Sequence, residues 1–323
     1  MTEIVAIDIG GTHARFALAQ VQGGTVLRLG EVCTLETARH ASLQTAWEAF
    51  GAAVGHPLPN AAAIALAGPV QGGTVKLTNN PWVIRPGSLP STLGVERFTL
   101  VNDFGAVAHA VAQLGDEHYT YLCGPDRPLP EEGVISIVGP GTGLGVAQLL
   151  RRGGLCHVVE TEGGHVDFAP LDDLEDRILA RLRLRHGRVS VERIASGMGL
   201  ANLYEALAAI EGRDTGYRDE KALWQAALAG EDDLAAAAFD RFCLSLGAVA
   251  GDIALAQGAR AVVIGGGLGL RLAGHLPRSG FRGRFVAKGR FERRMDEIPV
   301  KIVTYAQPGL FGAAAAFAAE HVE

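Results

Sequence analysis

Short apolar runs alternate with glycine turns and amphipathic stretches along the first third of the chain. The run at 4–7, IVAI, stops at the turn DIGGT, and a second apolar run, RFALAQV, follows at once. Two such runs joined by a tight glycine turn are typical of paired strands. Strands that alternate with helices indicate an α/β fold. We predict further strands at 25–35, 61–67 and 97–101, and helices at 41–54 and 103–114.

Helical patterns dominate after residue 170. The segment 171–188, LDDLEDRILARLRLRHGR, has acidic residues at its start, arginines at its end and an apolar stripe. This distribution complements the dipole of an amphipathic helix. Further helices are predicted at 198–211, 219–229 and 232–257. The end of the chain predicts a strand, a glycine turn and a helix over 260–276, a strand at 300–305 and an Ala-rich helix at 308–320.

The first strand–turn–strand pattern recurs further along the chain. Residues 4–19, IVAIDIGGTHARFALA, can be laid over 135–150, ISIVGPGTGLGVAQLL, without gaps, so that Gly10 falls on Gly141. The match is weak residue by residue, and chance is the alternative explanation. The recurrence suggests two structurally related halves.

Composition and charge exclude several classes of protein. The chain has 323 residues, of which 48% are hydrophobic and 20% charged, so we expect two globular domains. Its net charge of −6 and the lack of a long basic block argue against nucleic acid as a partner. No cysteine pair has C-x-x-C spacing, which argues against thiolate zinc and disulfides. We see no signal peptide and no apolar stretch of about 18 residues, and therefore expect a cytoplasmic protein without a membrane span.

Glycine accounts for 43 of the residues and gathers in three turns after apolar runs: 8–12, 139–145 and 265–269. Without β-carbons, backbone N–H groups can approach phosphate oxygens closely. Thr12 and Thr142 could add hydroxyl donors. Neither the P-loop nor the dinucleotide fingerprint is present, so each turn alone could be an ordinary hairpin. Three such turns together favour a nucleotide site.

Two aspartates lie at predicted strand ends. Asp8, at the end of the first strand, could hold Mg²⁺ through water, or could simply cap the turn. Asp103 follows Asn102 where a strand gives way to a helix, a favoured position for ligand sites. Asp103 could accept a proton from a substrate hydroxyl, with Asn102 binding a polyol. The alternative is that Asp103 only caps the helix.

The segment 160–170, ETEGGHVDFAP, could be a metal site, an acid–base pair or a loop that binds a polar ligand. Glu162 and His165 have the E-x-x-H spacing that presents two ligands together on a helix. The intervening Gly163 and Gly164 are poor helix residues, and no second such motif completes a site. Metal binding is therefore the least favoured interpretation.

The glycine turns and the Asn102–Asp103 pair resemble those of the actin-like ATPase superfamily and, within it, the bacterial glucokinase family. The resemblance covers nearly the whole chain. His13 and Gln307 stand where asparagine is more usual. The cysteine-rich zinc motif of the related repressor and kinase family is missing from the sequence, so no structural zinc is expected. The motifs that carry the resemblance are DIGGTHARFAL, LTNNPW, VNDFGAVA, GPGTGLGVA, EGGHVDFAP, SVERIASGMGL, VVIGGGL, SGFRGRF, KGRF and QPGLFG.

The resemblance implies an α/β fold of two actin-like ATPase (ribonuclease-H-like) domains with an interdomain cleft. A small domain would comprise 1–113 and 306–323, so that the C-terminal helix returns to it, and a large domain would comprise 114–305. The implied activity is ATP-dependent phosphorylation of D-glucose at the 6-hydroxyl, with Mg²⁺ bound alongside ATP. The implied assembly is a homodimer.

The resemblance also assigns roles to residues. Asp103 would be the general base, and the position of Asp103 makes Glu162 and His165 sugar ligands rather than an acid–base pair. The sugar would be bound by Asn102, Asp103, Glu162, His165 and Glu192. The nucleotide would be bound by Asp8, Gly10, Gly11 and Thr12, by Gly141, Thr142 and Gly143, and, near the adenosine, by Gly265 and Gly266.

Three alternatives remain open at this point. The chain could be a kinase for another hexose or an acetamido sugar. A sugar-responsive repressor is disfavoured, because it would need a helix-turn-helix module and the chain begins on its first core strand. A non-catalytic actin-like scaffold would not need the Asn102–Asp103 pair.

Overall fold

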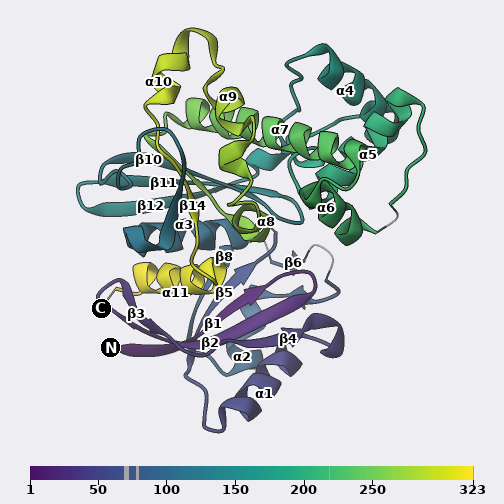
Figure 1. The fold of residues 1–323 in the computed structure, drawn as a ribbon. Coiled ribbons are helices and arrows are strands. Elements are labelled where there is room, and N and C mark those ends of the chain that lie inside the picture. Colours follow the sequence, from purple (N-terminus) through teal and green to yellow (C-terminus); the bar gives the residue numbers. More distant parts are fainter. Residues whose placement is uncertain (69–72, 78–79, 218, 323) are drawn as a thin grey trace. The chain divides into compact units, whose positions relative to one another are not determined.

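The computed structural model describes residues 1–68, 73–77, 80–217 and 219–322, and the chain divides into two compact units (Figure 1). Unit 1 comprises Met1–Gly115 and Tyr305–Glu323, and unit 2 comprises Asp116–Thr304. Residues 78 and 79 of the LTNNPW motif lie outside the described residues. Both units contain a mixed β-sheet and helices, which confirms the predicted α/β class.

The main sheet of unit 1 has the order β3-β2-β1-β5-β8, and β4 also pairs with β2. β1 is antiparallel to β2 and parallel to β5, and β5 is parallel to β8. The carboxyl ends of β1, β5 and β8 therefore meet at one edge. The strands are β1 (Thr2–Ile9), β2 (His13–Gln22), β3 (Thr25–Leu29), β4 (Cys33–Glu36), β5 (Ala61–Leu66) and β8 (Arg97–Asn102), and a small second sheet pairs β6 (Val75–Lys76) with β7 (Val83–Ile84).

The strand predicted at 25–35 is two strands. β3 pairs with the second half of β2, where Leu29 faces Ala19, whereas β4 pairs with the first half, where Cys33 faces Phe16. Between them, Gly30 donates its N–H to the carbonyl of Leu18 over 2.8 Å. The prediction of one strand was wrong because the break is set by pairing with β2 and not by the local sequence.

Helices cover both faces of the unit 1 sheet (Figure 1). Successive side chains of β1 point to opposite faces of the sheet. Val5 and Ile7 pack in one cluster with α1, and Ile4 and Ala6 pack in another with α11. The predicted helices are confirmed to within two residues at each end. They are α1 (Leu43–Val54), α3 (Asp103–Gln113) and α11 (Pro308–Glu320), and a short α2 spans Leu89–Leu93.

Small residues let α11 approach α3. A β-carbon added at Gly312 would lie 1.7 Å from the carbonyl oxygen of Ala106, far inside van der Waals contact. The sheet beneath presents Ala63 and Ala65 to the same cluster. The Ala-rich composition of the last helix is therefore a packing requirement, and α11 forms part of the core of unit 1.

The sheet of unit 2 has the order β12-β11-β10-β13-β14-β9. β10 is antiparallel to β11 and parallel to β13, as β1 is to β2 and β5 in unit 1. β14 is parallel to β13 and antiparallel to β9. The strands are β9 (Tyr119–Cys123), β10 (Gly133–Pro140), β11 (Leu144–Arg152), β12 (Leu155–Thr161), β13 (Ala261–Ile264) and β14 (Val300–Val303).

The two hairpins correspond, but not without a gap. Residues 10–13 lie between the paired Ile9 and Ala14 in unit 1, whereas only 141–143 lie between Pro140 and Leu144 in unit 2. The gapless overlay is therefore right for the first strand and wrong for the second strand, which needs a shift of one residue.

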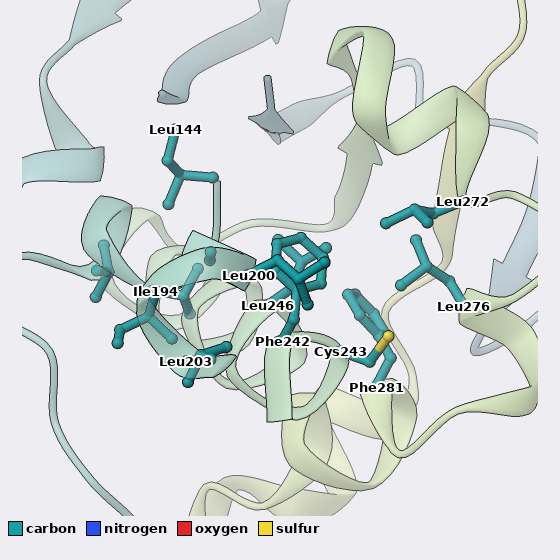
Figure 2. Close-up of a cluster of buried hydrophobic side chains, with 14 of the residues drawn as sticks. Leu144, Ile194, Leu200, Leu203, Phe242, Cys243, Leu246, Leu272, Leu276 and Phe281 are labelled. Atoms are coloured by element: carbon teal, nitrogen blue, oxygen red, sulfur yellow. The ribbon is translucent and has the colours of Figure 1, made fainter. Parts of the chain in front are cut away.

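The core of unit 2 forms around α7. Figure 2 shows Phe242, Cys243 and Leu246 of α7 among Leu200 and Leu203 of α5 and other buried side chains. By length and composition α7 could cross a membrane, contrary to the expectation that no apolar stretch is long enough. Of its most apolar 18 residues, however, 61% are buried inside the protein. The helices are α4 (Asp173–His186), α5 (Gly197–Glu211), α6 (Glu220–Ala229), α7 (Asp233–Gln257), α8 (Gly266–Arg271), α9 (Phe281–Val286) and α10 (Glu292–Asp296).

We expect Gly312→Ala to destabilise the protein, because its β-carbon would collide with the backbone at Ala106. Overpacking of this kind costs about 1–3 kcal/mol, which corresponds to a melting temperature lowered by several degrees. The matched control is Gly283→Ala in α9, where an added β-carbon meets nothing within 4 Å and should be neutral or slightly stabilising. Thermal unfolding of both variants checks this, and equal melting temperatures would contradict the close contact.

Candidate functional site

The glycine turn of unit 1 is fixed by hydrogen bonds to its carbonyl groups. Asn80 Nδ2 donates to the carbonyl of Gly10 over 3.0 Å. Thr37 donates twice, from Oγ1 to Gly11 over 2.9 Å and from its N–H to Thr12 over 3.0 Å. Within the described residues, the N–H groups of Gly11 and Thr12 donate to no protein acceptor. Exposed consecutive N–H donors form an anion-binding concavity.

Thr37 and Asn80 were missed as site residues. Asn80 is 9% exposed and belongs to the LTNNPW motif, so a signal was present. Thr37 is 2% exposed and lies in no such motif, and only the pairing of β4 with β2 brings it to the turn.

The Asn102–Asp103 pair occupies the start of α3. Asn102 is the residue that caps the helix, because its Oδ1 accepts from the N–H groups of Phe104 and Gly105 over 2.8 and 3.3 Å. Its Nδ2 donates to the carbonyl of Gly68 over 3.2 Å. Asp103 is the first helical residue, and its Oδ1 also accepts from Phe104 N over 2.9 Å. The local reading of Asp103 as the cap was therefore wrong in its choice of residue.

Sheet register brings the turn and Asp103 to the same edge. Ile9 of β1 pairs with Leu66 of β5, and Leu66 pairs with Asn102 of β8. Two strand spacings of about 4.8 Å separate the ends of β1 and β8. The phosphate-type turn and the Asp103 carboxylate thus begin about 10 Å apart on neighbouring parallel strand ends, where α/β sheets bind ligands.

Asp8 is a largely buried carboxylate beside this turn. Its Oδ2 lies 3.4 Å from Nη1 of Arg15, and Arg15 is the residue that pairs with Asp8 across the β1–β2 hairpin. A β-carbon added at Gly309, at the start of α11, would lie 3.1 Å from the same oxygen. Burial raises the pKa of the Asp8 carboxyl, although the charge and hydrogen bond of Arg15 act in the opposite direction.

The second glycine turn, in unit 2, is joined to Glu192. Glu192 Oε2 accepts from the N–H of Leu144 over 2.9 Å and would lie 2.3 Å from a β-carbon added at Gly143. Gly141 donates to the carbonyl of Gly143 and accepts from the N–H of Gly197. In the described part of the chain, the N–H groups of Thr142 and Gly143 have no protein acceptor, which repeats the arrangement at Gly11 and Thr12.

The loop of Glu162 and His165 packs on β11 through its two glycines. A β-carbon at Gly163 would lie 2.9 Å from Val146 Cγ1, and one at Gly164 would lie 2.0 Å from the carbonyl oxygen of Leu144. The loop forms a single 3₁₀ turn, Gly163–His165. Glu162 Oε2 and His165 Nε2 are 3.9 Å apart, and both side chains are more than half exposed.

Residues 188–192 run beside this loop. The N–H of Val191 donates to the carbonyl of Val166 over 2.9 Å. Arg188 binds the carbonyl of His165 at 2.6 Å and the carboxylate of Asp167 at 2.7 Å. These contacts place Glu192 next to the 162–165 loop, and they give Asp167 a structural partner.

The third glycine turn, after β13, lies beside the second. Gly265 donates its N–H to the carbonyl of Val138 over 2.9 Å. Gly266 has a φ of 77°, and a β-carbon there would lie 2.6 Å from the carbonyl oxygen of Pro140. Glycine is therefore needed at position 266 for β13 to turn into α8 against the end of β10. Unit 2 thus brings together its two glycine turns, Glu192 and the Glu162–His165 loop.

The described residues contain no group of three or more His, Cys, Asp or Glu side chains placed to hold a metal ion. Glu162 and His165 accordingly lack a third protein ligand among them.

A family model described as Glucokinase matches residues 5–320. The chain belongs to the glucokinase family. It is 66% identical to a glucokinase of Zymomonas mobilis over 321 residues, which cover 99% of both chains. It is 42% identical to a glucokinase of Caulobacter vibrioides over 316 residues, 97% of this chain and 94% of the relative. The family predicted from the sequence motifs is confirmed.

Solved structures share the actin-like ATPase fold of this family. A glucokinase from an Antarctic psychrotroph has a TM-score of 0.85 and 35% identity, covering 98% of this chain and 99% of its own. A glucokinase from Balamuthia mandrillaris in complex with glucose has a TM-score of 0.80 at 21% identity, covering 99% of this chain and 94% of its own. A ROK family glucokinase from Streptomyces griseus in complex with glucose and AMPPNP has a TM-score of 0.62 at 20% identity, covering 97% of this chain and 98% of its own. The last two likenesses concern the fold alone.

Asp8→Asn should raise the melting temperature near neutral pH. Because the pKa of Asp8 is raised in the folded state, the folded protein holds this proton more tightly than the unfolded chain does. The protonated Asp8 carboxyl therefore stabilises the folded state fully below the pKa of aspartate in the unfolded chain, about 4, and this stabilisation is lost as pH rises through the pKa of Asp8 in the folded protein. The gain from the variant should therefore be large at high pH and shrink on acidification.

Melting temperatures measured across pH check this prediction. The exposed Asp214 provides the control, and Asp214→Asn should show no comparable pH-dependent gain. A gain from Asp8→Asn that is absent, or that grows on acidification, would show that Asp8 is not destabilised by burial.

Proposed function

We propose that the chain transfers the γ-phosphoryl group of ATP to the 6-hydroxyl of D-glucose, with Asp103 as the general base. Membership of the glucokinase family supports the activity. The observation that supports the role of Asp103 is its position one residue beyond the end of β8, at the sheet edge that also carries the N–H groups of Gly11 and Thr12.

Asp103 accepts the proton of the attacking hydroxyl in this proposal. Asp103 lies in the first turn of α3, the end of the helix that carries a partial positive charge. The hydrogen bond from Phe104 N to Asp103 Oδ1 fixes the orientation of the carboxylate. Phosphoryl transfer depends mainly on positioning and charge stabilisation. One oriented general base is therefore enough, and no covalent intermediate with the protein is needed.

Asn102, Asp103, Glu162, His165 and Glu192 bind the sugar in this proposal. Carboxylates, an amide and an imidazole are the groups expected to hydrogen-bond sugar hydroxyls, and bonds to the charged groups are the stronger ones. Glu162 and His165 are exposed and adjacent, which suits contact with a polar ligand. Glu192 also holds the second glycine turn through Leu144, so it would connect sugar binding to phosphate binding.

The nucleotide is bound by the glycine turns. Gly10, Gly11 and Thr12, and Gly141, Thr142 and Gly143, would surround the ATP phosphates, and Gly265 and Gly266 would lie near the adenosine. Asp8 fits Mg²⁺ held through water, because it is one carboxylate at the phosphate-type turn and Mg²⁺ commonly takes one or two carboxylates plus substrate phosphates. Bound Mg²⁺ would supply neutralisation of phosphate charge.

We further assign the two compact units to the small and large domains of the family, and infer a cytoplasmic homodimer that does not bind nucleic acid or membranes. The exact domain boundaries, the dimer and the location rest on the family resemblance. The net charge of −6 agrees with a protein that does not bind nucleic acid.

Asp103→Asn should lower kcat by ~10²-fold or more, because an amide cannot accept the hydroxyl proton. The matched control is Glu162→Gln, which also converts a proposed sugar ligand to an amide. That control should chiefly raise the KM for glucose and leave kcat much closer to the parent. Steady-state kinetics separate the two outcomes. Near-parental kcat in Asp103→Asn would leave Asp103 with a structural role only.

Glucose should have the highest kcat/KM among hexoses in a coupled assay of ADP release. Mannose and N-acetylglucosamine differ from glucose at C2 and are the informative competitors. If either one exceeded glucose by about tenfold, a difference of ~1.4 kcal/mol in transition-state binding, the alternative of another sugar kinase would replace the glucose assignment.

A further inference from the structure

A cavity of about 520 Å³ opens at the edge of the unit 2 sheet where the parallel strands begin. Three arginines line its wall. Arg127 lies in the loop after β9, Arg260 immediately precedes β13, and Arg294 lies in α10. Glu297 also lines it, and Pro128 and Ala259 supply an apolar part of the wall. The volume lies within the range of about 300–1,000 Å³ that is usual for small-molecule sites.

The three arginines give this cavity its chemistry. Within the part of the chain that the structure describes, none of them forms an ion pair with a carboxylate. Arg127 donates from Nη2 to the backbone carbonyl of Glu297 over 3.0 Å, a bond that orients the side chain and leaves its charge uncompensated. Three guanidinium groups and the single carboxylate of Glu297 leave the lining with an excess of two positive charges.

The backbone holds the position of Arg260. Its N–H donates to the carbonyl of Val134 over 2.8 Å. Its side chain covers Gly133, where an added β-carbon would lie 2.6 Å from Arg260 Cδ. Gly133 has a φ of 104° and begins β10, so a residue with a side chain there would be strained and would displace the arginine.

The cavity is remote from the phosphate turns of the same unit. β10 runs for eight residues from Gly133, beside Arg260, to Pro140, beside the second glycine turn. At about 3.3 Å per residue the two ends are roughly 23 Å apart. A ligand at the arginines cannot be the phosphate chain of an ATP bound at the turn.

We propose that this cavity binds a small phosphate-bearing anion, at a second site separate from the catalytic one. Guanidinium groups bind phosphate oxygens in a bidentate manner and stay charged at all physiological pH values. The excess of two positive charges matches a phosphate dianion. The apolar wall and Glu297, which can accept from a hydroxyl, leave room for the organic part of a phosphate ester as well as for free phosphate.

Calorimetric titration of the full chain tests the proposal. Saturating AMPPNP and glucose are present throughout, so that the catalytic phosphate and sugar contacts are already occupied. Inorganic phosphate and glycerol 3-phosphate are titrated separately at low ionic strength. We expect one anion bound per chain, and binding weakened by about tenfold or more in the double variant Arg260→Gln/Arg294→Gln, because charge-assisted bonds are lost.

Arg177→Gln/Arg181→Gln is the matched control, since it removes the same charge from exposed positions of α4 and should bind the anions like the parent. Tighter binding of the ester than of free phosphate would identify an ester as the ligand, and equal binding would identify phosphate itself. Both results support the site. The proposal would be overturned by a dissociation constant above about 10 mM, which is a binding free energy weaker than roughly −3 kcal/mol. An equal loss of anion binding in both double variants would also overturn it.

Retention of kcat by the double variant is the check on folding, because these arginines lie outside the proposed catalytic groups. If that variant does not fold, Arg294→Gln alone takes its place, since Arg294 is exposed and forms no ion pair among the described residues. Unchanged anion binding in a folded Arg294→Gln variant would count against the site.

Discussion

The register of β1 between β2 and β5 determines where the chemistry of unit 1 lies. The antiparallel hairpin ends in a turn whose carbonyls are bound by Asn80 and Thr37, whereas the N–H groups of Gly11 and Thr12 face no acceptor in the described fold. The parallel pairing with β5 brings Asn102 to the same edge. A slip of one residue would exchange the two faces of β1 and move Ile7 from the cluster with α1 into the alanine-rich cluster with α11, so packing on both faces specifies the register.

Unit 2 repeats this constraint with a different turn. The turn of its hairpin is one residue shorter. Thr37 and Asn80 fix the turn of unit 1, whereas in unit 2 Glu192 accepts a hydrogen bond from the N–H of Leu144, the first residue after the turn. The same chemical result, two adjacent N–H donors without an acceptor in the described residues, is reached with different supporting side chains. This explains why the two halves resemble each other in pattern and only weakly in residues.

Much of this arrangement could be predicted from the sequence. Apolar periodicity located the helices and most strands, and the glycine turns and Asn102–Asp103 marked the strand ends. The cap of α3 could not be predicted, because Asn102 and Asp103 are both good capping residues and the backbone decides between them. The contribution of Thr37, the division of β3 from β4 and the contact of Glu192 with Leu144 depend on segments distant in sequence, which local patterns do not contain.

Glycines in this chain serve different purposes that the sequence does not distinguish. An added β-carbon would strike the backbone at Gly164 and Gly312, so those positions serve the packing of the fold. At Gly10 it would make only an ordinary contact at 3.6 Å, and at Gly141 it would meet nothing within 4 Å. The fold leaves room for a side chain at these last two positions, so packing alone does not require glycine there, whereas the proposed approach of the ATP phosphates would.

The placement of α11 has a consequence for synthesis on the ribosome. Unit 2 is a continuous segment of the chain, whereas unit 1 needs residues 305–323 to complete its core. Translation proceeds from the N-terminus, so unit 2 can fold as soon as it emerges. The sheet of unit 1 emerges earlier, yet its alanine face stays uncovered by α11 until the last helix has been made. The N-terminal unit is thus the later of the two to reach its finished state.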